Sequence, residues 1–446
     1  MTVEPKMEKT LGPLSLWGLG VGYVISGMYF GWNLGLEQGG TLGLAMATCW
    51  VIAMYISFTL GYAELACLYP RAGGCFIYVQ NAMGPKWGML AGLAQFFEFV
   101  FAPPAIAAAI GAYLHIFFPA ISTLTLAIGA YFIFTGINCL GVRLAATFEL
   151  WITVVAVIEL VLFAYVALPH FQMKNLVTNA LPHGWAGVLP AIPFAIWFFL
   201  AIEGIANVAE ETKNPQRNII LGFSSAMVTL VILCGLTFVS AIGVNGWEWI
   251  VFDAAGNPSD SPLPLALKAI MGENALFYHL LVMIGIFGLV ASFHGIILAA
   301  GRATFELGRE GLAPARIGRL HPRTKTPVWA LLLNMCVGIC ALVTGKTAQI
   351  IILACFGAVT LYLLSTVALW QLRRKKPTLH RPFRTPFFPY TAIVALITSS
   401  TSLCCLVYYY PNLALIYGGL LCAGGLGMGY MGSHSRIKIY FDTEKT

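Results

Sequence analysis

Three carboxylates lie deep inside apolar stretches of this chain, at Glu98, Glu159 and Glu203. A charged side chain at the centre of a membrane-spanning helix costs about 2.5–3.5 kcal/mol on insertion scales. No lysine or arginine lies at comparable depth in the same stretches, so each carboxylate must bind a cation, share a proton or be neutral. The pattern predicts a site for small cations or a proton-coupled site.

The segment around Glu203 holds the strongest candidate. Within Pro193–Arg217, an aromatic run leads to Glu203 and Gly204, and charges with a proline follow. Glycine lowers helix propensity by about 1 kcal/mol relative to alanine. A helix that is both charged and weakened near mid-membrane is typical of a substrate site in a transporter. We therefore expect a helix break at Ala201–Gly204.

A matching break is expected in the first apolar stretch, at Ile25–Met28, after three alternate glycines. Interrupted helices at corresponding positions of two halves indicate a binding site built on inverted repeats. Such a break frees backbone N–H and C=O groups, which then bind substrate. The alternative is that these glycines only allow close helix packing.

Aromatic and imidazole groups add further candidates. Phe199 lies next to the second break, and an ammonium group over an aromatic face gains about 0.5–2 kcal/mol. His294 is either a proton relay or a hydrogen-bonded packing residue. Glu37 and Glu306, near span ends, have solvent or a nearby arginine to satisfy them. The predicted substrate contacts are Ile25, Ser26, Gly27, Met28, Glu98, Phe199, Ala201, Ile202 and Glu203, and the coupling candidates are Glu159, Glu203 and His294.

Composition places these residues in a membrane. The chain has 446 residues, of which 59% are hydrophobic and 10% charged, whereas soluble proteins have about 25% charged residues. Lipid must therefore be its solvent. The expected architecture is all-α with twelve spans: 14–36, 41–67, 87–114, 121–140, 147–168, 188–208, 218–242, 276–307, 327–345, 347–371, 388–409 and 412–432.

Charge asymmetry predicts the orientation. Of the 25 lysines and arginines, all but Lys174, Lys268 and Lys346 fall on the side of the termini. The positive-inside rule then places both termini in the cytoplasm and the chain in the plasma (inner) membrane. The net charge of +7 follows from this bias and does not indicate nucleic-acid binding. No nucleotide, hydrolase or metal motif is present, so we expect no enzyme, cofactor or metal site.

Four stretches resemble the amino acid–polyamine–organocation (APC) superfamily: Val24–Tyr29, Ala63–Leu65 with Pro70–Gly74, Ala209–Pro215, and Leu307–Pro314. The resemblance covers essentially the full length. It implies a LeuT-type fold in which helices one and six are broken mid-membrane and substrate binds between helices one, three, six and eight. The implied organisation is a tail at 1–13, a first repeat of five helices at 14–168, an inverted repeat at 188–371, two further helices at 388–432, and a tail at 433–446.

Within that superfamily, Gly31–Gly40 and Trp197–Gly204 are similar to the ethanolamine permease branch. This implies a secondary active transporter that moves ethanolamine or a similar small amine by alternating access. An amino acid permease or exchanger of the same fold is the alternative. A sensor would need a soluble domain and a channel a polar ring, and neither pattern is present. The exact amine, the possible coupling proton and the oligomeric state stay open.

Two departures from the family pattern bear on mechanism. Many amino acid carriers have glycine where Ala201 stands, which predicts a less open break. Many sodium-independent relatives have a lysine in helix five, where the aligned triplet here is Ile158–Glu159–Leu160. In those relatives the lysine stands in for a sodium ion. A glutamate reverses the sign, which favours a cationic substrate or a different proton relay.

Overall fold

The computed structural model describes residues 9–253 and 256–434, so the predicted tails at 1–13 and 433–446 lie largely outside the described residues. In the described part, the regular elements are helices. Two isolated β-bridges, Leu11 with Thr212 and Phe252 with Pro258, lie outside them. The α-helices are α1 (Pro13–Tyr29), α2 (Leu34–Leu68), α3 (Cys75–Met83), α4 (Pro85–Phe117), α5 (Thr123–Leu140), α6 (Val142–Ala167), α7 (Met173–Val177), α8 (Ile192–Trp197), α9 (Pro215–Asn245), α10 (Glu248–Val251), α11 (Pro262–Met271), α12 (Leu276–Arg309), α13 (Val328–Leu342), α14 (Thr347–Lys375), α15 (Tyr390–Tyr409) and α16 (Pro411–His434). The 3-10 helices are η1 (Leu168–His170), η2 (Gly184–Gly187) and η3 (Ile202–Glu211).

The helices match a membrane setting. Ten of those described are long and apolar enough to cross a bilayer. The first and ninth predicted spans form the shorter helices α1, with 17 residues, and α13, with 15. Large apolar side chains face outward, Trp151 being 68% exposed and Ile232 63%. Because helices satisfy their backbone hydrogen bonds internally, this all-α architecture suits a lipid solvent, and the predicted all-α membrane fold is confirmed.

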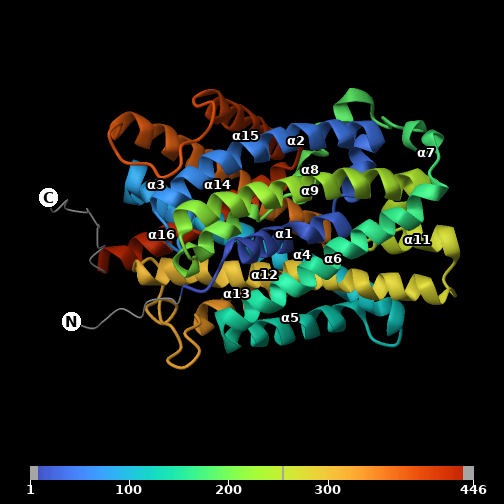
Figure 1. Cartoon of the computed structure of the whole chain (residues 1–446), viewed down its shortest axis with the longest axis horizontal. Coiled ribbons are helices and arrows are strands. Elements are labelled where there is room, and N and C mark those ends of the chain that lie inside the picture. Colours follow the sequence, from blue (N-terminus) through green and yellow to red (C-terminus); the bar gives the residue numbers. More distant parts are fainter. Residues whose placement is uncertain (1–8, 254–255, 435–446) are drawn as a thin grey trace.

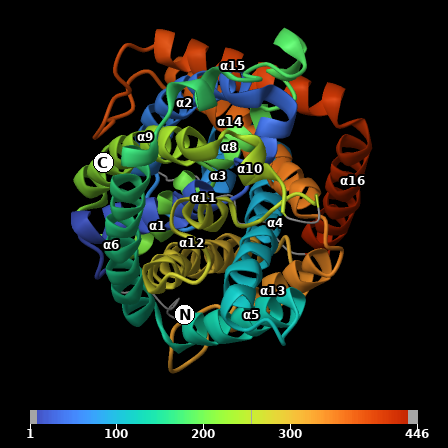
Figure 2. The same ribbon diagram turned by 90° about the vertical axis from the view of Figure 1, so that its right-hand side faces the viewer.

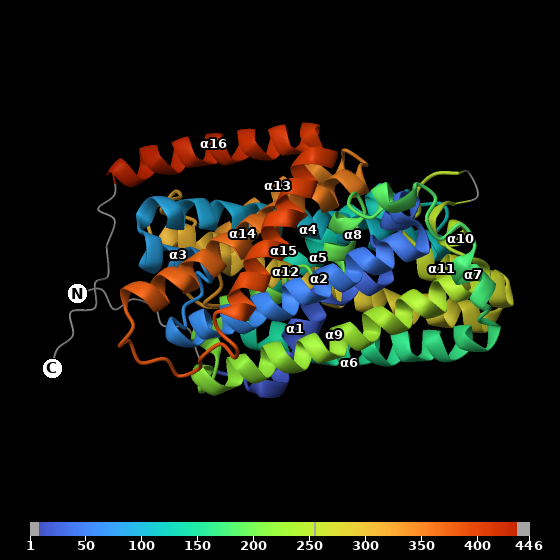
Figure 3. The ribbon, with the colours of Figure 1, turned by 90° about the horizontal axis from the view of Figure 1, so that it is seen from above.

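The long helices run side by side along one axis (Figure 1). Seen along that axis, α1, α4, α8 and α12 lie near the centre, and α15 and α16 lie at the periphery (Figure 2). The view from above also shows α16 on the outside of the bundle (Figure 3). One end of the bundle carries α3 and the arginine-rich loops at 310–327 and 376–389, and we call it the basic end; α7 and α11 lie at the opposite end (Figure 1).

Helix one is interrupted, but later than predicted. Residues 25–28 are helical, and α1 continues to Tyr29. The interruption spans 30–33, where Gly31 has a φ of +87° that favours glycine. A short helical segment at 34–39 completes the span, and Gly40, with φ +64°, starts the next one. The expected break at Ile25–Met28 is therefore wrong by several residues, because the residue that needs a positive φ is Gly31.

Helix six is interrupted close to the predicted position. The helix α8 ends at Trp197, residues 198–201 form turns, and η3 begins at Ile202. The break thus includes Ala201, as expected, but Glu203 and Gly204 already lie in the 3-10 helix. Both interrupted helices that the inverted repeat requires are present, whereas the symmetry between the two sets of five helices stays a prediction.

The long loop before α12 packs onto the break in helix one. The Asn33 Nδ2 donates to the carbonyls of Ile250 and Ser259, over 3.0 and 2.9 Å. The next residue, Asp260, accepts a hydrogen bond of 3.0 Å from Thr347 at the start of α14. The loop therefore ties the first interrupted helix to α14 at the end of the bundle opposite the basic end.

Asp260 makes this attachment pH-dependent. Burial raises the pKa of its carboxyl from 3.8 to about 6, although the bond from Thr347 opposes the shift. Because the folded pKa is the higher one, the contribution of Asp260 to stability falls as pH rises from about 4 to about 6. We expect Asp260→Asn to be more stable than wild type near pH 7, by at most about 3 kcal/mol, with little difference near pH 4. Thermal melting at both pH values measures this, with exposed Glu248→Gln as the control; a pH-independent difference would contradict it.

Candidate functional site

Two buried carboxyl groups meet at the break in helix six. Glu98 on α4 and Glu203 at the start of η3 are both 0% exposed and lie within hydrogen-bonding reach of each other. Neither Glu98 oxygen, nor Glu203 Oε1, has a donor with normal hydrogen-bond geometry. Among the described residues, neither carboxyl forms an ion pair. Two carboxyls so placed must share a proton or hold a cation between them.

Aromatic side chains surround this pair. The Tyr362 hydroxyl on α14 donates to Glu203 Oε2 over 3.1 Å, and it lies 2.9 Å from the Tyr55 hydroxyl on α2. The Tyr55 ring contacts Phe199 with centroids 5.4 Å apart. Rings of this kind, next to negative charge, form a favourable environment for an ammonium group. The sequence interpretation singled out Phe199 but missed both tyrosines, because nothing along α2 or α14 distinguishes them from ordinary span residues.

The two interrupted helices contact each other directly. A Cβ on Gly27 would lie 2.5 Å from the carbonyl oxygen of Trp197, so only glycine allows this approach. The Trp197 indole donates to the Phe30 carbonyl over 3.0 Å. The Ser26 hydroxyl donates to Ser292 on α12 over 2.7 Å. Gly27 and Ser26 therefore hold α1 against α8 and α12, and a role for Ile25–Met28 in binding substrate stays a proposal.

Ala201 takes the conformation that glycine usually has in such a break. Its φ of +76° and ψ of +9° lie in the left-handed region, where an L-residue is disfavoured by about 1–2 kcal/mol. We therefore expect Ala201→Gly to melt at or above the wild-type temperature. The control Ala206→Gly, inside η3, should melt lower because glycine weakens a helix by about 1 kcal/mol. Equal losses in the two variants would contradict this account.

The other coupling candidates lie away from the carboxyl pair. Glu159 on α6 is 2% exposed and lies near the Tyr29 hydroxyl at the end of α1, which donates to the Ala156 carbonyl over 3.0 Å. Its second oxygen, Oε2, has no partner among the described residues. His294 on α12 has its Nδ1 2.8 Å from Asn138 Nδ2 on α5 and packs its ring against Phe148. Glu159 and His294 thus have neighbours other than Glu98 and Glu203, and their roles in coupling stay predictions.

A family model described as amino acid permease matches residues 11–420, which is most of the chain. The chain belongs to the amino acid permease family. This membership confirms the predicted APC superfamily, and it identifies the protein as a transporter and not an enzyme.

Curated relatives agree with this assignment. The permease is 28% identical to an uncharacterized transporter of Rhizobium meliloti (strain 1021), over 89% of its own length and 86% of the relative. It is 26% identical to the methylthioribose transporter of Bacillus subtilis (strain 168), over 87% and 86% of the two chains. It is also 24% identical to a branched-chain amino acid permease of the same bacterium, over 88% and 87%.

Three of the family-like stretches meet in one ion network at the basic end of the permease. Arg71 contacts Glu306 over 2.9 Å and Glu310 over 3.1 Å. Arg309 contacts Glu210 over 2.8 Å and Glu306 over 2.7 Å. Glu306 is thus satisfied by arginines, as expected for an acid near a span end. The network joins the loop before α3 to the ends of η3 and α12, so it holds these three segments together.

Helices one and six are also joined at the basic end. The backbone N–H of Thr10 and of Leu11 donate to the Glu211 carbonyl, over 2.9 and 3.0 Å, and Lys213 N–H donates to the Leu11 carbonyl over 2.8 Å. The Glu211 side chain pairs with fully buried Arg302 on α12 over 3.0 Å. Displacement of either interrupted helix would therefore be transmitted to the other.

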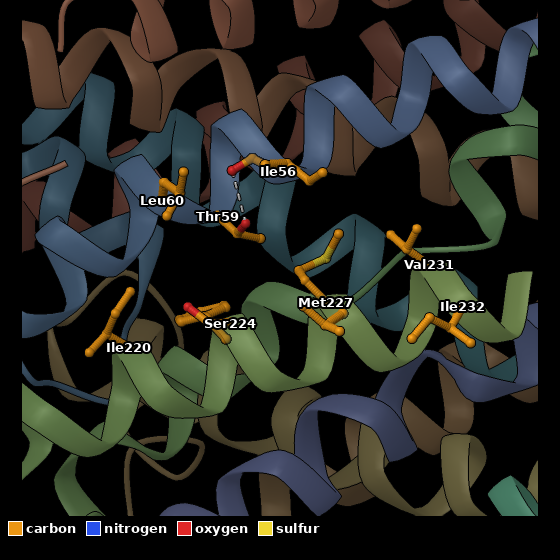
Figure 4. A pocket seen from close by; sticks show the side chains of 10 residues that line it. Ile56, Thr59, Leu60, Ile220, Ser224, Met227, Val231 and Ile232 are labelled. Atoms are coloured by element: carbon orange, nitrogen blue, oxygen red, sulfur yellow. Dashed lines mark hydrogen bonds between the residues drawn. The ribbon is translucent and has the colours of Figure 1, made fainter. Parts of the chain in front are cut away.

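A lateral groove of about 330 Å³ lies between α2 and α9 and is unrelated to the carboxyl pair (Figure 4). Its lining is apolar except for Thr59 and Ser224, and the Thr59 hydroxyl already donates to the Ile56 carbonyl over 3.2 Å. None of the predicted site residues lines it. Its chemistry matches the surrounding lipid tails and not a charged substrate.

Proposed function

We propose that this permease is a secondary active transporter for ethanolamine or a similar small primary amine, working by alternating access in the plasma membrane with both termini cytoplasmic. The observation that carries the proposal is the pair of buried carboxyls, Glu98 and Glu203, at the break in helix six. An ammonium group between them would supply the positive charge that the described residues around them lack. The resemblance of Gly31–Gly40 and Trp197–Gly204 to ethanolamine permeases supports the same substrate class.

The proposed binding mode follows from the chemistry of the site. The ammonium N–H groups donate to Glu98 and Glu203, and the rings of Phe199 and Tyr55 cover the cation. The Tyr362 hydroxyl, already bonded to Glu203, fixes the orientation of the carboxyl. The substrate hydroxyl binds the backbone around Ser26–Gly27, where α1 closely approaches Trp197 and Phe198. Charge balance gives this site its preference for cations.

An amino acid is the second candidate, because one relative is named a branched-chain amino acid permease. An amino acid brings a carboxylate as well as an ammonium group. Two acidic side chains at the binding site repel that carboxylate, and like charges in a desolvated site are strongly unfavourable. The Glu98–Glu203 pair therefore favours a simple amine over an amino acid.

Uptake of radiolabelled ethanolamine into proteoliposomes, with and without a pH gradient, tests the proposal. Unlabelled ethanolamine, choline, alanine, glutamate and arginine are added as competitors, and liposomes without protein are the control. We expect ethanolamine to compete best, and alanine and glutamate to compete poorly. Strong inhibition by alanine together with no uptake of ethanolamine would contradict an amine substrate and support an amino acid carrier of the same fold.

A further inference from the structure

A further buried acid, Glu149 on α6, lies outside the site described above. It is 0% exposed, and neither carboxyl oxygen has a hydrogen-bond partner among the described residues. A desolvated carboxylate without a counterion or a donor is strongly unfavourable. In this conformation, the side chain must therefore carry a proton or bind a cation.

Glycines on two neighbouring helices form a slot around this carboxyl. A Cβ on Gly22 of α1 would clash with Glu149 Oε1, and a Cβ on Gly295 of α12 would lie 2.7 Å from the same oxygen. Both helices therefore present bare backbone to the acid. Because the slot has one wall from α1 and one from α12, relative displacement of these two helices opens it to water.

The surroundings fit a proton better than a metal ion. Hard divalent cations in proteins take about six or more oxygen ligands. The neighbouring Thr153 hydroxyl already donates to the Gly18 carbonyl over 3.1 Å, and the described residues hold no cluster of three or more His, Cys, Asp or Glu suited to a metal. A single proton on one carboxyl oxygen removes the negative charge of Glu149, the largest part of its desolvation cost, without any further ligand.

Among the described side chains, the titratable groups near Glu149 do not supply a counterion. Tyr23 on α1 lies near Glu149, and Arg302 and Glu211 are also among its charged neighbours. Arg302 and Glu211 neutralise each other, because they form an ion pair of 3.0 Å. His294, next to Gly295 on α12, is engaged with Asn138 on α5. The remaining titratable groups on helices packed against α6 include Tyr131 and Cys139 on α5, Arg217 and Cys234 on α9, and Lys268 on α11.

We propose that Glu149 is a proton-carrying site, separate from the substrate site, whose occupancy is coupled to the packing of α1 against α12. With the slot closed, the carboxyl is protonated. When α1 separates from α12, water reaches the carboxyl, its O–H bond breaks, the proton passes to water, and the hydrated carboxylate is left on α6. This inference deepens the proposed transport function and rests on it for its physiological meaning.

The test compares two modes of transport by purified protein in proteoliposomes. Exchange of labelled for unlabelled ethanolamine at equal pH needs no net proton movement, whereas accumulation driven by a pH gradient does. Glu149→Gln is expected to retain exchange but to lose gradient-driven accumulation, so that labelled ethanolamine inside the vesicles no longer rises above its concentration outside. Glu149→Asp, which stays titratable, is expected to retain accumulation with a shifted pH midpoint.

Glu37→Gln is the control, because Glu37 is an exposed acid that belongs neither to the substrate site nor to the coupling candidates. Gradient-driven accumulation by Glu149→Gln at the wild-type level would overturn the inference. So would an equal loss in Glu37→Gln, or wild-type transport driven by a sodium gradient and not a pH gradient. If Glu149→Gln does not fold, an unshifted pH midpoint in Glu149→Asp overturns the inference instead.

A second readout separates this inference from the proposed substrate. The infrared difference spectrum between purified wild type and Glu149→Gln is expected to show the carbonyl stretch of one protonated carboxyl near neutral pH. This measurement needs no substrate, so it tests Glu149 even if wild type transports no amine. Failure of wild type to transport any amine would overturn the proposed function alone. Absence of the band, where Glu149→Gln is folded, overturns the inference about Glu149 alone.

Discussion

Replacing Glu203 with glutamine is expected to abolish ethanolamine uptake while the protein still reaches the membrane. The substitution conserves size and can still accept the hydrogen bond from Tyr362, so the packing around it should persist. It removes the negative charge that an ammonium group would need. Loss of one member of a buried hydrogen-bonded charge pair costs about 2–5 kcal/mol, which corresponds to roughly 30-fold to several-thousand-fold weaker binding.

Initial uptake rates in proteoliposomes, normalised to the amount of inserted protein, measure this effect. Glu37→Gln is the matched control, because it removes an exposed acid from the same permease and should leave uptake within about twofold of wild type. Glu203→Asp keeps the charge and should recover part of the rate. Undiminished uptake by Glu203→Gln would exclude a charge-based role for this residue.

The sequence could predict that Glu98 and Glu203 are costly, but not that they meet. Insertion cost depends on depth within a span, which local composition reveals. Contact between α4 and η3 depends on tertiary packing and on the break that turns η3 toward α4. The same reason explains why Tyr55 and Tyr362 were missed, since each acquires its role only from partners more than 100 residues away.

The break in helix one shows a different limit. The glycines at 18, 20, 22, 27 and 31 look equivalent in sequence, yet each meets a different neighbour in the structure. Gly27 allows the approach of Trp197, whereas Gly31 supplies the positive φ at the interruption. A glycine needed for close packing and one needed for its backbone conformation cannot be distinguished from spacing alone.

Glu149 was overlooked for a related reason. It lies two residues after the predicted start of the fifth span at residue 147, where an acid normally reaches solvent. In the structure, α1 and α12 cover this position, and the side chain is fully buried. The helix α6 begins at Val142, before the predicted start of the span, so Glu149 lies well inside the helix and not at its end.

Replacing Arg302 with methionine is expected to give the largest loss of stability. Arg302 is 0% exposed, its Nε donates to Glu211 over 3.0 Å, and its Nη1 donates to the Leu298 carbonyl over 3.2 Å. Methionine fills a similar volume but leaves Glu211 as a buried carboxylate without a counterion. Breaking a buried ion pair from one side destabilises a protein by about 3–5 kcal/mol.

Thermal melting of the purified permease measures this loss, with Arg316→Met as an exposed control of the same chemistry. The double variant Arg302→Met with Glu211→Gln removes the orphaned charge, so it should recover most of the stability, because replacing both members of a buried pair is often nearly neutral. Recovery in the double variant identifies the unpaired Glu211 carboxylate, and not lost packing, as the cause. Equal destabilisation of the single and double variants would instead assign the role of Arg302 to its contacts with α12.

The single variant is further expected to loosen the junction between helices one and six. The reason is that the Glu211 backbone carbonyl accepts hydrogen bonds from the backbone N–H groups of Thr10 and Leu11.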